Sequence, residues 1–78
     1  MADPQPETVH LDTTGLICPL PILRAKKAIK SVPPGGRLEV LATDPGAQPD
    51  FRTFCEVTGH ALVLEEENEG VFRFIIQT

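Results

Sequence analysis

The strongest chemical signal in the sequence is a cysteine that lies between a turn and the predicted start of a helix. Cys18 follows Gly15 and precedes two prolines, Pro19 and Pro21. The first amides of a helix have no acceptor within the helix, and the aligned peptide dipoles place about half a positive charge there. Such a position lowers a thiol's pKa from about 8.5 into a range of roughly 3.5 to 7.5, and the thiolate attacks sulfur. We therefore predict that Cys18 is a reactive nucleophile; the alternative is a buried apolar side chain.

The residues around Cys18 suit this position. Gly15 allows the chain to turn, and prolines in a first helical turn cost little because the amides there have no intrahelical acceptor to lose. Proline also fixes the backbone angle of its own residue. We therefore expect Gly15, Pro19 and Pro21 to support the placement of Cys18.

Neither the second cysteine nor the two histidines indicate a further site. Cys55 lies one helical turn after Phe51, so we predict that it packs in the core. His10 and His60 form no close pair with each other or with a cysteine, and such pairs are the usual sequence signature of zinc. We expect no metal ion and no cofactor.

Length and composition are typical of a small folded domain. The chain has 78 residues, of which 41% are hydrophobic and 23% charged, so it has enough residues for one core and is too apolar to be disordered. No apolar run approaches the roughly 20 residues that span a bilayer, and residues 1–7 lack the features of a signal peptide. We therefore expect a cytoplasmic protein whose two cysteines are free thiols.

Alternating apolar and polar residues predict four strands within one domain over residues 7–78. Residues 1–6 contain two prolines and few apolar side chains, so we expect them to form a flexible lead-in. The alternation has the period of a half-buried strand. The predicted strands cover residues 8–12, 37–43, 61–66 and 71–78, and the last two form an antiparallel hairpin.

Two helices are predicted to separate the first three strands. Apolar residues at three- and four-residue spacing predict the first helix over residues 19–32. Asp44 is predicted to cap the second helix, as Asp12 is predicted to form a turn. Because Pro49 would interrupt a regular helix, we expect a kink there and a main segment over residues 50–58. The residues on or near the apolar face of that segment are Phe51, Phe54, Cys55 and Val57.

The resulting order of elements is β-α-β-α-β-β. Connections between parallel strands are right-handed in nearly all proteins, so two such connections place both helices on the same face of the sheet. We therefore predict an α+β two-layer sandwich, in which two helices pack on one face of a four-stranded mixed sheet. Phe72, Phe74 and Ile76 in the last strand are predicted to face the helices.

The segment that carries Cys18 resembles a known family. Residues 11–21 read Leu-Asp-Thr-Thr-Gly-Leu-Ile-Cys-Pro-Leu-Pro, which is similar to the TusA/SirA/YeeD-like sulfur carrier family, whose hallmark is Cys-Pro-X-Pro. The resemblance spans nearly the whole chain and includes Asp44-Pro45 before the second helix. It implies the same βαβαββ order, with two helices stacked on a four-stranded sheet.

The resemblance also implies a function. Cys18 is expected to accept sulfane sulfur as a persulfide from a cysteine desulfurase or a rhodanese-like donor, and to pass it to a downstream acceptor protein. The pathways of the family include tRNA thiolation, molybdenum-cofactor synthesis and sulfur oxidation. Such a carrier relays sulfur rather than turning over a small substrate, so it needs an accessible nucleophile and a docking surface. We expect a monomer that makes no membrane contact.

Basic residues gather around the predicted first helix. The formal net charge is −4, yet five of the seven basic residues lie between residues 22 and 37, a segment without Asp or Glu. Leu23 falls among these charges, one turn from Cys18. An apolar anchor within a charged rim is usual in transient interfaces, so we predict a partner-docking face; the alternative is an ordinary solvated helix surface. The docking face consists of Leu23, Arg24, Lys26, Lys27 and Lys30.

Two other functions are alternatives to sulfur transfer. A βαβαββ order with a basic helix is compatible with RNA binding, but the chain is acidic, has no Tyr or Trp, and has four Phe that pattern into the core. These features leave no stacking platform, so we expect no direct nucleic-acid contact. A redox-sensing module would also use Cys18, and it would gain oxygen instead of sulfur.

Overall fold

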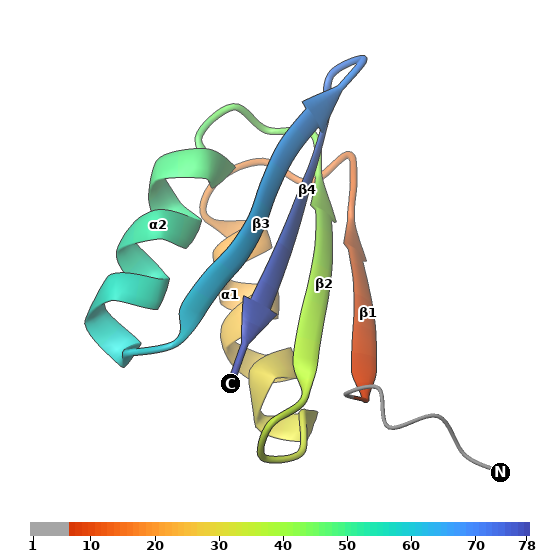
Figure 1. Cartoon of the computed structure of the whole chain (residues 1–78). Helices are drawn as coiled ribbons and strands as arrows, with labels where there is room; N and C mark the ends of the chain where they lie inside the picture. The colour runs from red at the N-terminus through yellow and green to blue at the C-terminus, as the bar shows by residue number, and fades with distance from the viewer. Residues whose placement is uncertain (1–6) are drawn as a thin grey trace, which may run out of the picture.

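The computed structural model describes residues 7–78 as four strands and two helices (Figure 1). The strands are β1 (Thr8–Thr13), β2 (Arg37–Ala42), β3 (Ala61–Asn68) and β4 (Val71–Gln77), and the helices are α1 (Leu20–Ala28) and α2 (Ala47–Thr58). This order confirms the predicted βαβαββ arrangement. The predicted lead-in over residues 1–6 lies outside the described residues.

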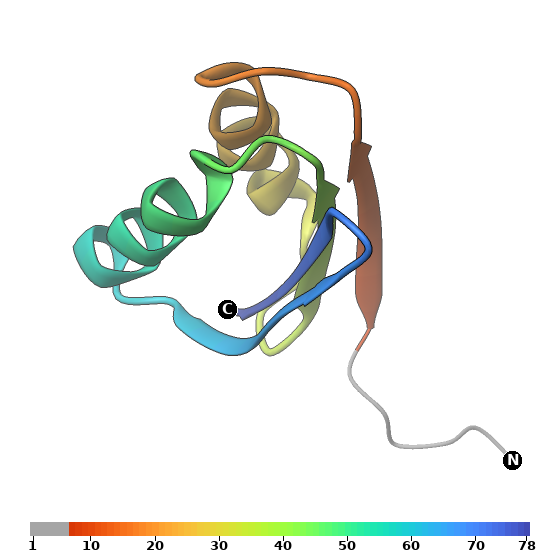
Figure 2. The ribbon, with the colours of Figure 1, turned by 90° about the horizontal axis from the view of Figure 1, so that it is seen from above.

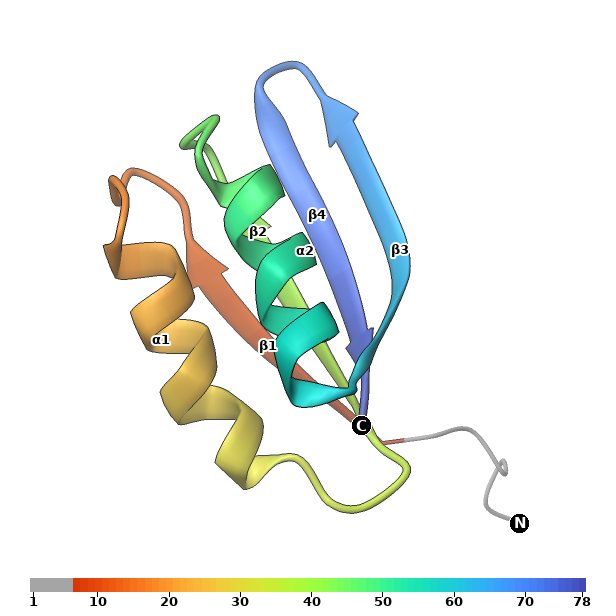
Figure 3. The ribbon, with the colours of Figure 1, turned by 90° about the vertical axis from the view of Figure 1, so that its left-hand side faces the viewer.

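The four strands form one mixed sheet with both helices on the same face. The strand order is β1-β2-β4-β3, in which β1 is parallel to β2 and β4 is antiparallel to both of its neighbours. Strands β1, β2 and β3 therefore share one direction, and each helix connects two of them. Figures 2 and 3 show α1 and α2 side by side over the sheet, which confirms the two-layer prediction. Both helices consequently begin at the same edge of the sheet.

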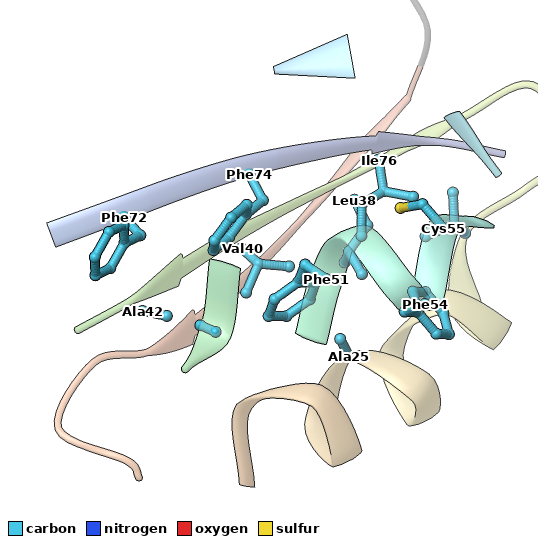
Figure 4. Packing of buried hydrophobic residues seen from close by; sticks show 12 residues of the cluster. Ala25, Leu38, Val40, Ala42, Phe51, Phe54, Cys55, Phe72, Phe74 and Ile76 are labelled. Atoms are coloured by element: carbon cyan, nitrogen blue, oxygen red, sulfur yellow. The ribbon is translucent and has the colours of Figure 1, made fainter. Parts of the chain in front are cut away.

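The core lies between the two layers (Figure 4). The ring of Phe51 from α2 stacks on Phe74 from β4, with the ring centroids 4.7 Å apart. Cys55 is buried as predicted, and its side chain is only 5% exposed. Val57 is 78% exposed, so it lies near the predicted apolar face but outside the core. Two residues of an α-helix span about 200°, which turns Val57 away from the side that buries Cys55. Phe72, Phe74 and Ile76 are all buried against the helical layer, as predicted.

Helix α2 begins at Ala47 and is continuous, so the predicted kink is wrong. Pro49 is the third residue of this helix, where an amide has no acceptor within the helix, and the missing N–H therefore breaks no hydrogen bond. The predicted cap is also wrong, because Gly46 occupies the N-cap position and no side chain caps the helix. The carboxylate of Asp44 has a different partner.

Helix α1 is shorter than the predicted 19–32. Its regular part ends at Ala28, and residues Ile29–Ser31 form a tighter 3-10 turn. Val32 then adopts an extended backbone with ψ of 125°. Helical geometry is disfavoured in the residue before a proline, and Pro33 therefore ends the helical segment.

The hairpin between β3 and β4 is tighter than predicted. Strand β3 continues to Asn68, which pairs with Val71, so only Glu69 and Gly70 form the turn. Their φ values are 51° and 81°. Positive φ at both positions is the geometry that matches a two-residue turn to the twist of its strands.

A charged network covers the face of the sheet that the helices leave open. Glu39 on the central strand β2 accepts hydrogen bonds from His10 on β1 at 2.7 Å and from Arg73 on β4 at 2.6 Å. Arg73 also donates to Glu66 on β3 at 2.9 Å. The network spans all four strands, and it lowers the pKa of Glu39 chiefly through the hydrogen bond from Arg73.

Candidate functional site

Cys18 lies where the loops after β1 and β2 meet. Neighbouring parallel strands end at the same edge of a sheet, so the segments that follow them are close together. The amide of Gly15 donates to Thr43 Oγ1 at 2.9 Å, and the amide of Cys18 donates to Asp44 Oδ2 at 3.2 Å. These two hydrogen bonds hold the loop that carries Cys18 against the loop before α2.

Two glycines allow this close approach. Gly15 has a φ of 82°, which residues with a side chain rarely adopt. A Cβ atom at Gly46 would lie 2.9 Å from Asp44 Oδ2 and 3.6 Å from the Cys18 Cβ atom. A larger residue at position 46 would therefore displace the carboxylate that holds the Cys18 amide.

The prolines lie in the first turn of α1. Pro19 is the N-cap residue, and its carbonyl accepts the amide of Leu23 at 3.1 Å. Pro21 is buried, whereas Pro19 is exposed. The peptide bond between Cys18 and Pro19 is cis. Cys18 thus lies at the junction of turn and helix.

The thiol of Cys18 is exposed, and it contacts the first turn of α2. Cys18 Sγ donates a hydrogen bond to Asp50 Oδ2 at 3.2 Å. This hydrogen bond, together with partial desolvation and the negative charges of Asp50 and Asp44, raises the pKa of the thiol above its ordinary value. The prediction that the helix start lowers this pKa is therefore wrong for the free protein. Two nearby carboxylates outweigh the partial positive charge of the nine-residue helix.

An apolar groove runs between α1 and α2 and begins at Cys18. Its volume is about 660 Å³. Because both helices start at the same edge of the sheet, Cys18 and Asp50 lie together where the helices begin, and His60, which follows α2, also lines the groove. The exposed side chain of Val57 lines the groove. Its apolar walls include Pro19, Ile22, Ile29, Phe54 and Val57.

The predicted docking face is exposed beside this groove. Leu23 is 50% exposed on α1. Lys26 lines the groove itself, so the docking face and the groove adjoin. Within residues 7–78, the basic side chains of the docking face take part in no ion pair with an acidic residue. Those exposed basic residues are Arg24, Lys26, Lys27 and Lys30.

The described residues give little support for a metal site, a membrane-spanning helix or an RNA-binding surface. Over residues 7–78, no group of three or more His, Cys, Asp or Glu side chains is arranged to hold a metal ion. In the same part of the chain, no helix has the length and apolar character needed to cross a membrane. All four Phe side chains are buried. The RNA-binding alternative therefore lacks an exposed phenylalanine ring on which a base could stack.

Neither carboxylate that contacts Cys18 is predicted as part of the site from the sequence alone. Asp44 has the residue type and position of a helix cap, and Asp50 is one of several acidic residues on a predicted helix. The signal that could identify Asp44 and Asp50 as site residues is the predicted topology of the sheet. If β1 and β2 are parallel neighbours, then the segment after β2 and the start of α2 must lie beside the segment after β1.

Comparison with known proteins identifies the family. Residues 9–78 match the family model described as sulfurtransferase TusA. The chain belongs to the TusA family. Sulfur carrier protein TusA of Allochromatium vinosum is 48% identical over 68 residues, which cover 87% of this chain and 90% of that protein. The protein NMA0882 of Neisseria meningitidis serogroup A is 57% identical over 67 residues, which cover 86% of this chain and 90% of that protein.

A solved structure supports the same assignment. The crystal structure of a SirA-like protein from Desulfitobacterium hafniense matches this TusA-family chain with a TM-score of 0.77 and 27% identity. The match covers 88% of this chain and 95% of that protein. The resemblance seen in the sequence is therefore confirmed at the level of family and fold, and the names of the relatives support a sulfur-carrier role.

The two thiols of this TusA-family chain should differ in reactivity. We expect iodoacetamide to modify Cys18 in the native protein and to spare Cys55, because burial shields the latter and raises its pKa. Peptide mass spectrometry after short reaction times measures the two rates. In denaturant, both cysteines should react at similar rates. Equal modification of Cys55 and Cys18 in the native protein would contradict the packing described above.

Proposed function

We propose that this TusA-family chain carries sulfur as a persulfide on Cys18 and relays it between proteins. The observation that carries the proposal is the position of Cys18, an exposed thiol in a Cys-Pro-X-Pro sequence at the open end of an apolar groove. Cys55 is buried and has no access to a partner. A donor can therefore reach only the first of the two thiols.

The transfer requires no external oxidant or reductant. The sulfur of Cys18 attacks the terminal sulfur of a donor persulfide, a new S–S bond forms, and the S–S bond of the donor breaks. The proton of the Cys18 thiol ends on the donor sulfur, which leaves as a thiol. In the second half of the relay, an acceptor nucleophile attacks the outer sulfur, and Cys18 departs as a thiolate that is protonated again.

The exposed site favours protein partners on both sides of the relay. An open groove on a domain of this size does not enclose a small substrate, whereas it leaves the thiol accessible to the active-site loop of another protein. We propose a cysteine desulfurase or a rhodanese-like protein as the donor and a further protein of a sulfur-transfer pathway as the acceptor. The docking face beside the groove provides the contact, with Leu23 as its apolar anchor.

Exchange of Cys18 for serine should abolish sulfur loading. The Cys18→Ser variant is expected to fold normally and to gain no sulfur when it is incubated with a cysteine desulfurase and cysteine. Intact mass spectrometry detects the added sulfur atom and separates it from the added oxygen that a redox sensor would gain after peroxide treatment. Loading of this variant to the wild-type level would overturn the proposal.

The Cys55→Ala variant is the matched control, since it removes the other thiol. It should load like the wild type and lose roughly 1 kcal/mol of unfolding free energy, because it leaves a small cavity in the core. Urea denaturation measures that loss.

Charge removal on the docking face should slow loading through association. In the double variant Lys26→Gln, Lys27→Gln we expect the loading rate at low salt to fall by roughly three- to tenfold. The rate should also depend less on ionic strength, because screening has fewer charges to act on. Rapid-mixing measurements of loading at several salt concentrations test both effects.

The control for this experiment lowers the net charge by the same amount at positions outside the docking face. In the double variant Thr8→Glu, Asn68→Asp, both changed residues are exposed on strands, and the net charge falls by the same two units. It should load at nearly the wild-type rate. If the lysine variant and this control behave alike, the docking face is an ordinary solvated surface.

A further inference from the structure

The contact between Cys18 and Asp50 joins two elements that are distant in the sequence. Cys18 precedes α1, and Asp50 lies in the first turn of α2. The separation between Cys18 Sγ and Asp50 Oδ2 is 3.2 Å, with the sulfur as donor. Only a protonated thiol can donate this hydrogen bond. The contact therefore depends on the chemical state of Cys18.

The charged groups around Cys18 are unevenly distributed. Asp50 accepts a hydrogen bond from the thiol, and Asp44, in the loop before α2, accepts one from the Cys18 amide. On the α1 side, Lys26 lines the groove, and His60, after α2, lines it as well. The carboxylates are thus the charged groups that form hydrogen bonds with Cys18, and Lys26 is a cation that lines the same groove.

We propose that Asp50 is a positioning residue that distinguishes the empty carrier from the loaded one. It holds the Cys18 thiol by a hydrogen bond before loading, and it repels the outer sulfur after loading. The outer sulfur then turns away from Asp50 towards the part of the groove that α1 lines. This inference rests on the proposed function, because it concerns the persulfide on Cys18.

The argument follows from the acid–base chemistry of the two states. A persulfide is a stronger acid than a thiol, so the loaded group is an anion near neutral pH and has no proton to donate. During loading, the proton of the Cys18 thiol is transferred to the donor sulfur, so the loading reaction balances. If the outer sulfur kept the place of the thiol, this anion would lie beside two carboxylates, and both would repel it. Lys26 is the cation in the groove that attracts it.

The Asp50→Asn variant tests the empty state. Asparagine keeps the size of the side chain and removes its charge, so the thiol should ionise at lower pH. We expect the iodoacetamide reaction rate at Cys18 to rise by roughly three- to tenfold at neutral pH, and its pH profile to shift to lower pH. Glu56→Gln is the matched control, because it removes one charge from an exposed position of the same helix. Its profile should coincide with that of the wild type.

The same variants test the loaded state. After loading by a desulfurase and cysteine, the outer sulfur of the wild type and of Asp50→Asn should react with iodoacetamide at rates within about twofold of each other, because the persulfide no longer contacts Asp50. Coincident profiles of empty Asp50→Asn and Glu56→Gln would overturn this inference alone. An equal acceleration in both states would refute the load-dependent release. If wild-type Cys18 gains no sulfur at all, the proposed function fails, and the loaded half of the inference fails with it.

Discussion

The hydrogen bond from the Cys18 amide to the Asp44 carboxylate joins the two halves of the fold at the place where the thiol is exposed. Cys18 belongs to the first strand–helix unit and Asp44 to the second. The bond requires β1 and β2 to be parallel neighbours, and it requires Gly46 to leave space for the carboxylate. This hydrogen bond places the Cys18 sulfur beside α2. A cysteine before α1 would otherwise be a loop residue with no defined relation to Asp50 or to the groove.

Two opposing electrostatic effects act on the pKa of the Cys18 thiol. The start of α1 favours a thiolate, whereas the hydrogen bond to Asp50 and the surrounding carboxylates favour the neutral thiol, and the second effect dominates because it acts at contact distance. Redox-sensing cysteines have lowered pKa values and accessible thiolates. The raised pKa of Cys18 therefore disfavours the redox-sensing alternative, because the thiol stays neutral up to a higher pH.

The parts of the structure that were predicted correctly depend on local pattern, and the parts that were missed depend on tertiary contacts. Alternation along residues 71–78 is sufficient to place Phe72, Phe74 and Ile76 in the core. In contrast, the role of Pro49 depends on the position at which α2 begins, and a shift of the start by a few residues moves this proline from an interior position to the first turn. Asp44 has the right chemistry for a cap, yet the amide of Cys18, which comes from another unit of the fold, takes its carboxylate.

The location of transferred sulfur tests the central claim most directly. Wild-type protein is incubated with a cysteine desulfurase and cysteine that carries radioactive sulfur, separated from the donor, and digested without reducing agent. We predict that the label lies on the peptide that contains Cys18 and that a small thiol releases it, as expected for a persulfide. Label on the peptide that contains Cys55, or label that is lost on denaturation before any thiol is added, would contradict the account.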